Sequence, residues 1–518
     1  MYHYDNDGCN AQIPSITARF AKSFWYQNFN RVPAVLTARP MVNSLRQNLM
    51  AKGHQVAEPA KFANGARAAL VLLLLINLFN YIDRYILAAN AGPIMDTFFG
   101  AGKELPPAEG PFSVLGLVHW VRKNFGFEPR MAVTAILATA FMVFYMVTAP
   151  MFGRLAERRS RWMLIGFAVI IWSLATGLSG LAATFGLLLM SRCLVGIGEG
   201  AYGPVAPALI SDYFPSQKRG RVLSWFYAAI PVGSALGYVI GSLIQKSDIG
   251  AWGEKHFGIW GESWRWAFYA VTIPGILLGL WACLKADPPR GQADAVAAWQ
   301  PRRADWRNYT LFWRIRSYVF CTLGMTAMTF AMGGIGFWMP YYLEKLPNAP
   351  AQATAIFGLV TVAAGLSATL LGGWAGDRLR ARFPSSYFMV SAISMLVGFP
   401  VFLMALHSGY PWVWVLIFMA CFCLFFSTGP TNAILANVTH PATRAEGFAL
   451  NIFFIHIFGD VISPVIIGML SDMFSIRVGF LAVGFMFLAS GIFWLFGMPH
   501  LARDMELAST RIRTDVES

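Results

Sequence analysis

Long apolar runs alternate with short polar connections along most of the chain after residue 65. Each run is close to or above the roughly 20 residues that a helix needs to cross a bilayer. The pattern predicts an all-α membrane protein with about twelve transmembrane helices in two six-helix halves. The expected spans cover residues 66–91, 131–152, 162–184, 187–213, 222–245, 265–285, 317–343, 352–375, 386–406, 411–438, 446–470 and 478–498.

The polar stretches define the remaining parts of the chain. The first 65 residues contain no apolar core of the roughly 7–15 residues that mark a signal peptide. A long connection at 92–130 contains an amphipathic piece that we expect on the non-cytoplasmic membrane surface. The expected parts are a cytoplasmic, disordered tail at 1–65, an N-terminal half at 66–285, a cytoplasmic linker at 286–316, a C-terminal half at 317–499 and a cytoplasmic tail at 500–518.

Composition supports the membrane assignment. The chain is 56% hydrophobic and only 13% charged, whereas soluble domains carry about 25% charged residues. Its net charge of +14 comes from basic residues in short connections between apolar runs, which is the pattern of cytoplasmic loops rather than of nucleic-acid binding. We therefore expect a multi-pass protein of a plasma or bacterial inner membrane, with both termini cytoplasmic. We expect no nucleic-acid partner, metal or cofactor.

Two apolar runs contain charged residues. Asp83 and Arg84 lie in the first span, and Arg192 and Glu199 lie in the fourth. A charge at the centre of a spanning helix costs about 2.5–3.5 kcal/mol, so these side chains should face protein or water. Arg192 and Glu199 share one helical stripe, whereas the adjacent Asp83 and Arg84 point about 100° apart and can each reach a different partner. We interpret the set as the polar wall of an internal cavity; the alternative is an ion pair that only locks two helices.

Further polar residues are candidates for the same cavity. Asn80 lies one turn before Arg84, and Tyr202 lies three residues after Glu199. In the second half His456 and Asp460 share a helix face at i, i+4. This pair fits either a pH-sensing role or a simple hydrogen bond between helices.

The two halves share a repeated connection after their second spans. In each copy an acid follows a glycine by four positions, and basic residues come next. We expect these loops to act at a cytoplasmic gate. The residues concerned are Gly153, Glu157 and Arg158 in the first copy and Gly373, Asp377 and Arg378 in the second. Parallel repeats of this kind are typical of secondary transporters, whose substrate site lies between the halves near the midplane.

The repeated loops resemble the cytoplasmic signature of the major facilitator superfamily, although Glu157 stands where an Asp is usual. A closer resemblance is to the Spinster family of lysolipid and sphingolipid transporters. It rests on four segments: NYIDRY at 80–85, RCLVGIGEGAYGPVAPALISDYFP at 192–215, PVGSALGYVIGS at 231–242 and NIFFIHIFGDVISPVIIGMLSD at 451–472. The resemblance implies a major facilitator fold. It also implies that Asp83 and Glu199 serve proton coupling and that Arg192 is needed for transport.

These observations predict a secondary active transporter of a small amphiphilic or anionic solute, lysolipid-like, driven by alternating access and coupled to protons. The protein should work as a monomer in the bilayer. A transporter of a small organic anion such as a sugar acid, held by Arg84 and Arg192, is an alternative, and a membrane sensor without transport is another. An enzyme is not expected, because the chain has no P-loop, no G-x-S-x-G and no metal-ligand spacing.

Overall fold

The computed structural model describes residues 65–100, 113–214, 216–258, 261–289, 310–440 and 443–509. Most of the predicted N-terminal tail, the middle of the predicted linker and the last nine residues lie outside this range. Within it every regular element is a helix. Twelve helices are long and apolar enough to cross a membrane, which confirms the all-α fold class.

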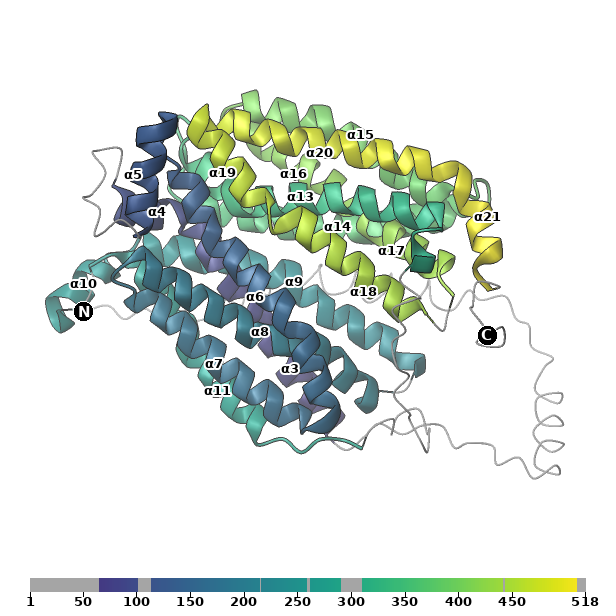
Figure 1. Cartoon of the computed structure of the whole chain (residues 1–518), viewed down its shortest axis with the longest axis horizontal. Helices are drawn as coiled ribbons and strands as arrows, with labels where there is room; N and C mark the ends of the chain where they lie inside the picture. The colour runs from purple at the N-terminus through teal and green to yellow at the C-terminus, as the bar shows by residue number, and fades with distance from the viewer. Residues whose placement is uncertain are drawn as a thin grey trace, which may run out of the picture. The chain divides into compact units, whose positions relative to one another are not determined.

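Six spans form each half (Figure 1). Those of the first half are α3 (Ala66–Ala89), α6 (Arg130–Arg158), α7 (Arg161–Leu181), α8 (Phe185–Tyr213), α9 (Ser216–Gln245) and α11 (Ser263–Cys283). Those of the second half are α13 (Arg316–Glu344), α14 (Ala353–Arg380), α15 (Ser386–His407), the pair α16 (Trp412–Phe426) and α17 (Thr428–Val438), the broken span α18 (Arg444–Ile455), η2 (His456–Asp460) and α19 (Ser463–Met473), and α20 (Ile476–Gly497). Shorter helices are α4 (Ala91–Phe99), α5 (Val114–Phe125), α10 (Ile249–Phe257) and α21 (Leu501–Glu506).

Three connections are more helical than the sequence predicted. The long connection at 92–130 begins inside α4, because Pro93 lies in the first turn, where a missing N–H costs little. The predicted gate loops are also wrong as loops, since α6 continues to Arg158 and α14 to Arg380. Strong helix formers follow Gly153, namely Arg, Leu, Ala, Glu and Arg, and they outweigh the cost of about 1 kcal/mol of one glycine. The second copy contains Gly376 as well as Gly373, but Ala375, Arg378, Leu379 and Arg380 favour the helix there.

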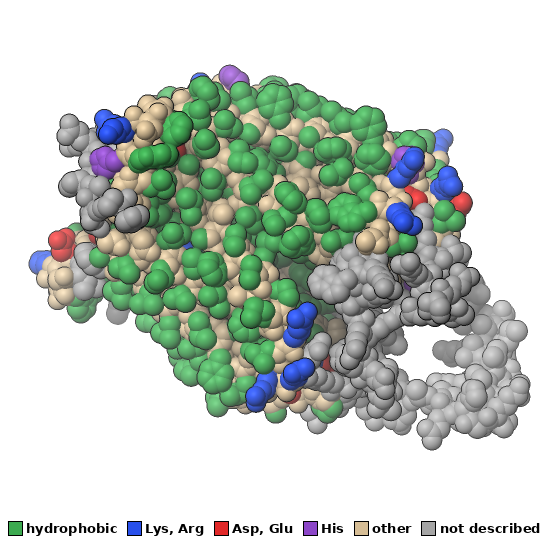
Figure 2. All heavy atoms as spheres, in the orientation of Figure 1, with side chains coloured by type: hydrophobic (Ala, Val, Ile, Leu, Met, Phe, Trp, Pro, Cys, Tyr) green, Lys and Arg blue, Asp and Glu red, His purple; other side chains and the backbone are tan. Residues whose placement is uncertain are grey.

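Apolar side chains cover the face of the molecule between its two ends, and Lys and Arg side chains gather toward those ends (Figure 2). Inside each half, glycines let helix backbones approach closely. Gly233, Gly237 and Gly241 of α9 contact α3: a Cβ on Gly237 would lie 2.7 Å from the Ile82 carbonyl oxygen and 2.8 Å from Tyr85 Cβ. This packing fixes the helix that carries Asp83 and Arg84.

Replacing Gly237 by valine should lower the melting temperature of the purified protein, because α3 must move to admit the new side chain. Overpacking of this kind typically costs about 1–3 kcal/mol. Thermal unfolding followed by size-exclusion chromatography measures the change. Gly373→Ala is the control, since no heavy atom lies within 4 Å of a Cβ at that position; equal melting of the two variants would contradict the packing argument.

In the part of the chain that the structure describes, the extended contacts between the two halves lie toward one end. α6 packs against α19, α9 against α14, and α3 and α4 against α13. Thr139 near the start of α6 donates a hydrogen bond of 2.5 Å to the carbonyl of Val461, and a Cβ on Gly358 near the start of α14 would lie 2.9 Å from the Ala235 carbonyl oxygen. The last turns of α6 and α14 carry the basic clusters, so the halves meet at the end away from those clusters. Among the described residues, α8, α17 and α18 make no extended contact with the opposite half.

Candidate functional site

An ion pair joins the first and fourth spans. Arg84 Nε on α3 lies 2.7 Å from Glu199 Oε2 on α8. The Glu199 side chain is fully buried, whereas 18% of the Arg84 side chain is exposed. A charge-assisted bond of this length is strong, and one of its partners can still be reached from outside the protein.

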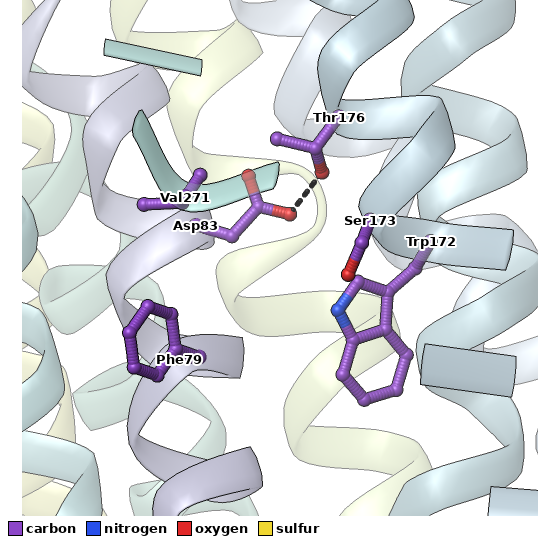
Figure 3. Close-up of a pocket in the computed structure, with 6 residues that line it drawn as sticks. All are labelled: Phe79, Asp83, Trp172, Ser173, Thr176 and Val271. Atoms are coloured by element: carbon purple, nitrogen blue, oxygen red, sulfur yellow. Dashed lines mark hydrogen bonds between the residues drawn. The ribbon is translucent and has the colours of Figure 1, made fainter. Parts of the chain in front are cut away.

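The second pair is looser. Arg192 Nη1 lies 3.6 Å from Asp83 Oδ1, beyond hydrogen-bond range, and both side chains are buried. Asp83 instead accepts a hydrogen bond of 2.6 Å from the Thr176 hydroxyl on α7. Figure 3 shows this carboxylate turned toward Thr176, beside a small pocket with room for about one water molecule. The predicted interpretation of separate partners for Asp83 and Arg84 agrees with this geometry.

Several polar atoms of the four-residue charge set formed by Asp83, Arg84, Arg192 and Glu199 lack partners. Asp83 Oδ1, Glu199 Oε1 and the Nε and Nη1 atoms of Arg192 are buried without a hydrogen bond to any described residue. A buried group left without its hydrogen bond costs about 1–3 kcal/mol, and more when it is charged. A set of ions that served only to lock two helices would gain from completing these bonds. The incomplete pairing favours a set that changes partners.

Aromatic rings surround the arginines of this charge set. The Arg84 guanidinium carbon lies 5.0 Å from the ring centre of Tyr81, 4.9 Å from that of Phe141 and 5.0 Å from that of Tyr145. The Phe141 ring also lies 5.4 Å from the guanidinium of Arg192. Such cation–π contacts hold an arginine in place while leaving its N–H groups free for an anion. Tyr81 lies within the NYIDRY segment noted in the sequence, but nothing in the sequence indicated that Phe141 and Tyr145 of α6 would contact Arg84.

The other predicted cavity residues of the first half, Asn80 and Tyr202, are buried. The side chain of Asn80 on α3 is buried within the protein. The Tyr202 hydroxyl donates a hydrogen bond of 2.6 Å to the carbonyl of Leu73, and its ring packs at 5.9 Å against Trp172. Tyr202 therefore braces α8 against α3 and α7.

In the second half, His456 Nδ1 lies 2.9 and 3.0 Å from the two carboxylate oxygens of Asp460. Both side chains are about one quarter exposed. They occupy the π-helical turn η2, a rare conformation that is frequent at functional sites. Asp460 also packs against Gly333 of α13.

Asp83→Asn should destabilise the protein, because it leaves the buried Arg192 charge without its acid. A loss of about 2–3 kcal/mol is expected. The double variant with Arg192→Gln should recover part of that loss, since it removes the unpaired charge as well. Thermal unfolding of the two single variants and the double variant gives the coupling; strictly additive losses would mean that the two residues do not interact.

The sequence matches the family model of the Major Facilitator Superfamily over residues 73–459. It is 32% identical to the sphingosine-1-phosphate transporter SPNS2 of Mus musculus, over 78% of this chain and 69% of the relative. It is also 32% identical to protein spinster homolog 1 of Homo sapiens, over 78% and 73% of the two chains. The chain belongs to the Spinster family of the major facilitator superfamily. Because this is a family of transporters, the expectation that the chain is not an enzyme is confirmed.

Solved structures agree on the fold. A bacterial homolog of the human lysosomal transporter Spinster, in an inward-facing and unoccupied conformation, matches with a TM-score of 0.67 at 21% identity, covering 88% of this chain and 100% of that one. A D-xylose–proton symporter matches with a TM-score of 0.62 at 16% identity, covering 84% and 98%. The chain is therefore an integral, multi-pass membrane protein with a major facilitator fold.

In this Spinster-family chain the predicted gate residues lie at the basic ends of α6 and α14. Arg158 and Arg378 are exposed, Gly153 and Gly373 lie inside helices, and the Glu157 side chain lies outside the described residues. Asp377 accepts a hydrogen bond of 2.7 Å from Tyr387 within the same half.

The strongest contacts at that end involve residues that the sequence did not single out. Arg161 is buried and pairs with Asp212. Asp287 accepts hydrogen bonds of 2.7 and 2.9 Å from the backbone N–H groups of Arg161 and Trp162, at the start of α7. Among the described residues, no group of three or more His, Cys, Asp or Glu side chains could hold a metal ion.

Proposed function

We propose that this protein is a proton-coupled secondary transporter that moves a small anionic amphiphile by alternating access. One observation carries the proposal: an arginine that is partly exposed and held by aromatic rings forms its ion pair with a glutamate that is fully buried and otherwise unpartnered. Intramembrane ionisable groups of this kind mark substrate and proton pathways.

The coupling follows from competition for Arg84. When Glu199 is ionised, its carboxylate occupies the guanidinium. A proton on Glu199 neutralises it and releases Arg84 for an anionic substrate. A substrate anion that reaches Arg84 first leaves Glu199 buried without a counter-charge, which favours proton uptake. Proton and anion therefore bind together, and the affinity for the anion rises as the pH falls.

Asp83 has a different role in this scheme. Its carboxylate points toward Thr176 of α7, beside the small pocket that Thr176 and Ser173 line. Through Arg192 and the shared ring of Phe141 it lies next to the coupled pair. We propose that Asp83 serves as a second proton acceptor that responds when the pairing of Arg84 changes.

The substrate class is proposed from the site together with the relatives. Arg84 offers a planar donor for a phosphate or carboxylate head group, and the matched SPNS2 proteins are named as transporters of sphingosine-1-phosphate, a single-chain lipid with a phosphate. We propose that the end of the molecule that carries the basic clusters lies on the cytoplasmic side of the membrane, because positively charged loops stay cytoplasmic. Both termini would lie on that side.

Purified protein in sealed liposomes with an imposed pH gradient tests the proposal. Internal pH is followed while lysophosphatidate or a small organic acid such as glucuronate is added. Proton movement driven by lysophosphatidate alone is the expected result. Movement driven only by the small acid would replace the amphiphile by a sugar acid, and no flux of either would favour a sensor.

A further inference from the structure

A carboxylate of the second half caps a helix of the first half. Asp472 in the last turn of α19 accepts hydrogen bonds of 3.0 and 2.9 Å from the backbone N–H groups of Met131 and Ala132. These belong to the first turn of α6, where N–H groups have no partner within the helix and the helix dipole attracts an anion. The capping position of α6 itself is Pro129, which has no side-chain acceptor. Asp472 of the second half therefore acts as the helix cap that α6 lacks in its own half.

The seam around this contact is built for close approach. Gly468 lies one turn before Asp472, and a Cβ there would lie 2.7 Å from the backbone nitrogen of Ala132. Arg130, which begins α6, is already engaged: it lies 2.5 Å from Glu128 and donates a bond of 2.7 Å to the Gly100 carbonyl. The carboxylate of Asp472 thus meets the amides of α6 directly.

Another polar contact, in addition to the Thr139–Val461 hydrogen bond, joins the halves at the same end. Lys246, the residue after α9, lies 3.3 Å from Glu344 of α13, with 32% and 26% of the two side chains exposed. Ion pairs open to water contribute only about 0–1 kcal/mol, and Glu344 also accepts a hydrogen bond of 2.8 Å from Thr354 in its own half. The two charge-assisted bonds that the half-buried Asp472 carboxylate accepts from the first turn of α6 should be stronger.

We propose that Asp472 is the latch that holds the two halves together at the end away from the basic clusters, and that the Lys246–Glu344 pair is secondary. This inference rests on the proposed alternating access, because both contacts must break whenever that end opens. The strength of the Asp472 contact then sets how often the cavity between the halves is open to that side.

Accessibility of a reporter cysteine tests the latch without any substrate. Met332→Cys, on the partly exposed face of α13 beside Gly333, is introduced into a protein whose other cysteines are replaced. Sealed vesicles are treated with a membrane-impermeant thiol reagent from the side of α10, identified by labelling of an exposed Lys255→Cys. Asp472→Asn, which keeps the shape but loses the charge and one acceptor, should raise the labelling rate at least about tenfold.

Three further variants make the result decisive. Gly468→Ala, which presses α19 away from α6, should raise labelling in the same direction, whereas Lys246→Gln should change it less than about fivefold. Asp248→Asn is the matched control, because this exposed acid at the start of α10 makes no capping bond. Unchanged labelling in a folded Asp472→Asn protein that still transports would overturn the latch. Increased labelling in a protein that transports nothing would leave the latch standing and remove the proposed function.

Discussion

A Glu199→Gln protein should bind lysophosphatidate with an affinity that no longer depends on pH, and should fail to accumulate it against a gradient. The glutamine resembles the protonated acid, so Arg84 is permanently free for the anion. In the parent protein, affinity should fall by up to about tenfold for each unit of rising pH over the range in which Glu199 loses its proton. At high pH the variant should therefore bind more tightly than the parent, while proton-driven uptake is lost.

Binding to protein in lipid nanodiscs over a range of pH, and uptake into liposomes with an imposed gradient, measure the two parts of this prediction. Glu506→Gln, which changes an exposed acid of α21, is the control and should leave both unchanged. A Glu199→Gln protein whose affinity keeps the parental pH dependence would exclude Glu199 as the group that competes with substrate.

Arg84→Gln should lose substrate binding by a factor on the order of a thousand, because it removes the charge that meets the anion and leaves Glu199 buried without a partner. The affinity of Arg84→Lys for the substrate should lie between those of the parent protein and Arg84→Gln. An ammonium keeps the charge but lacks the planar fork of a guanidinium and its stacking on Tyr81, Phe141 and Tyr145. Titration of both variants in nanodiscs gives the ratio.

The control for this series is Arg380→Gln. Arg380 also lies over a tyrosine ring, at 5.7 Å from the centre of Tyr387, but it is exposed at the basic end of α14. Its loss should not alter binding. If Arg84→Gln binds lysophosphatidate as well as Arg380→Gln does, the head group does not bind at Arg84.

The spans and the principal ion pairs could be predicted from the sequence for specific reasons. Apolar length alone locates a spanning helix, because the bilayer core has a fixed thickness. Adjacent residues on a helix diverge by about 100°, so Asp83 and Arg84 can reach different partners, and the fourth span offers one opposite charge for each of them. The structure adds that Arg84–Glu199 is the tight pair and Asp83–Arg192 the loose one.

The supporting contacts could not be predicted, because they depend on how helices far apart in sequence pack. Thr176 is a single hydroxyl in an apolar span, and Phe141 and Tyr145 look like ordinary residues of a lipid-facing helix until α6 is placed beside α3 and α8. Asp472 follows a spanning segment, where an acid is unremarkable in sequence. Its role as a helix cap depends on contact with the first turn of α6, which lies more than 300 residues earlier in the chain.

The positions at which helices end were also hard to predict from the sequence. The repeated segments contain charges together with one glycine at 153–158 and two glycines at 373–378, which resembles a loop in sequence. Both remain helical because the neighbouring Ala, Leu and Arg residues favour a helix more than the glycines disfavour it. α6 ends only where Ser160 accepts a hydrogen bond of 3.3 Å from the Met163 N–H to begin α7.

Substrate and Glu199 compete for Arg84 in the proposed mechanism, and proton exchange on binding measures this competition most directly. Protein in nanodiscs is placed in weakly buffered solution, and pH is recorded while a single-chain alkyl sulfonate is added, since that head group does not itself titrate. The account predicts uptake of protons approaching about one per bound anion, and none with Glu199→Gln. Saturable binding to the parent protein with no proton uptake at any pH between 5 and 9 would contradict it.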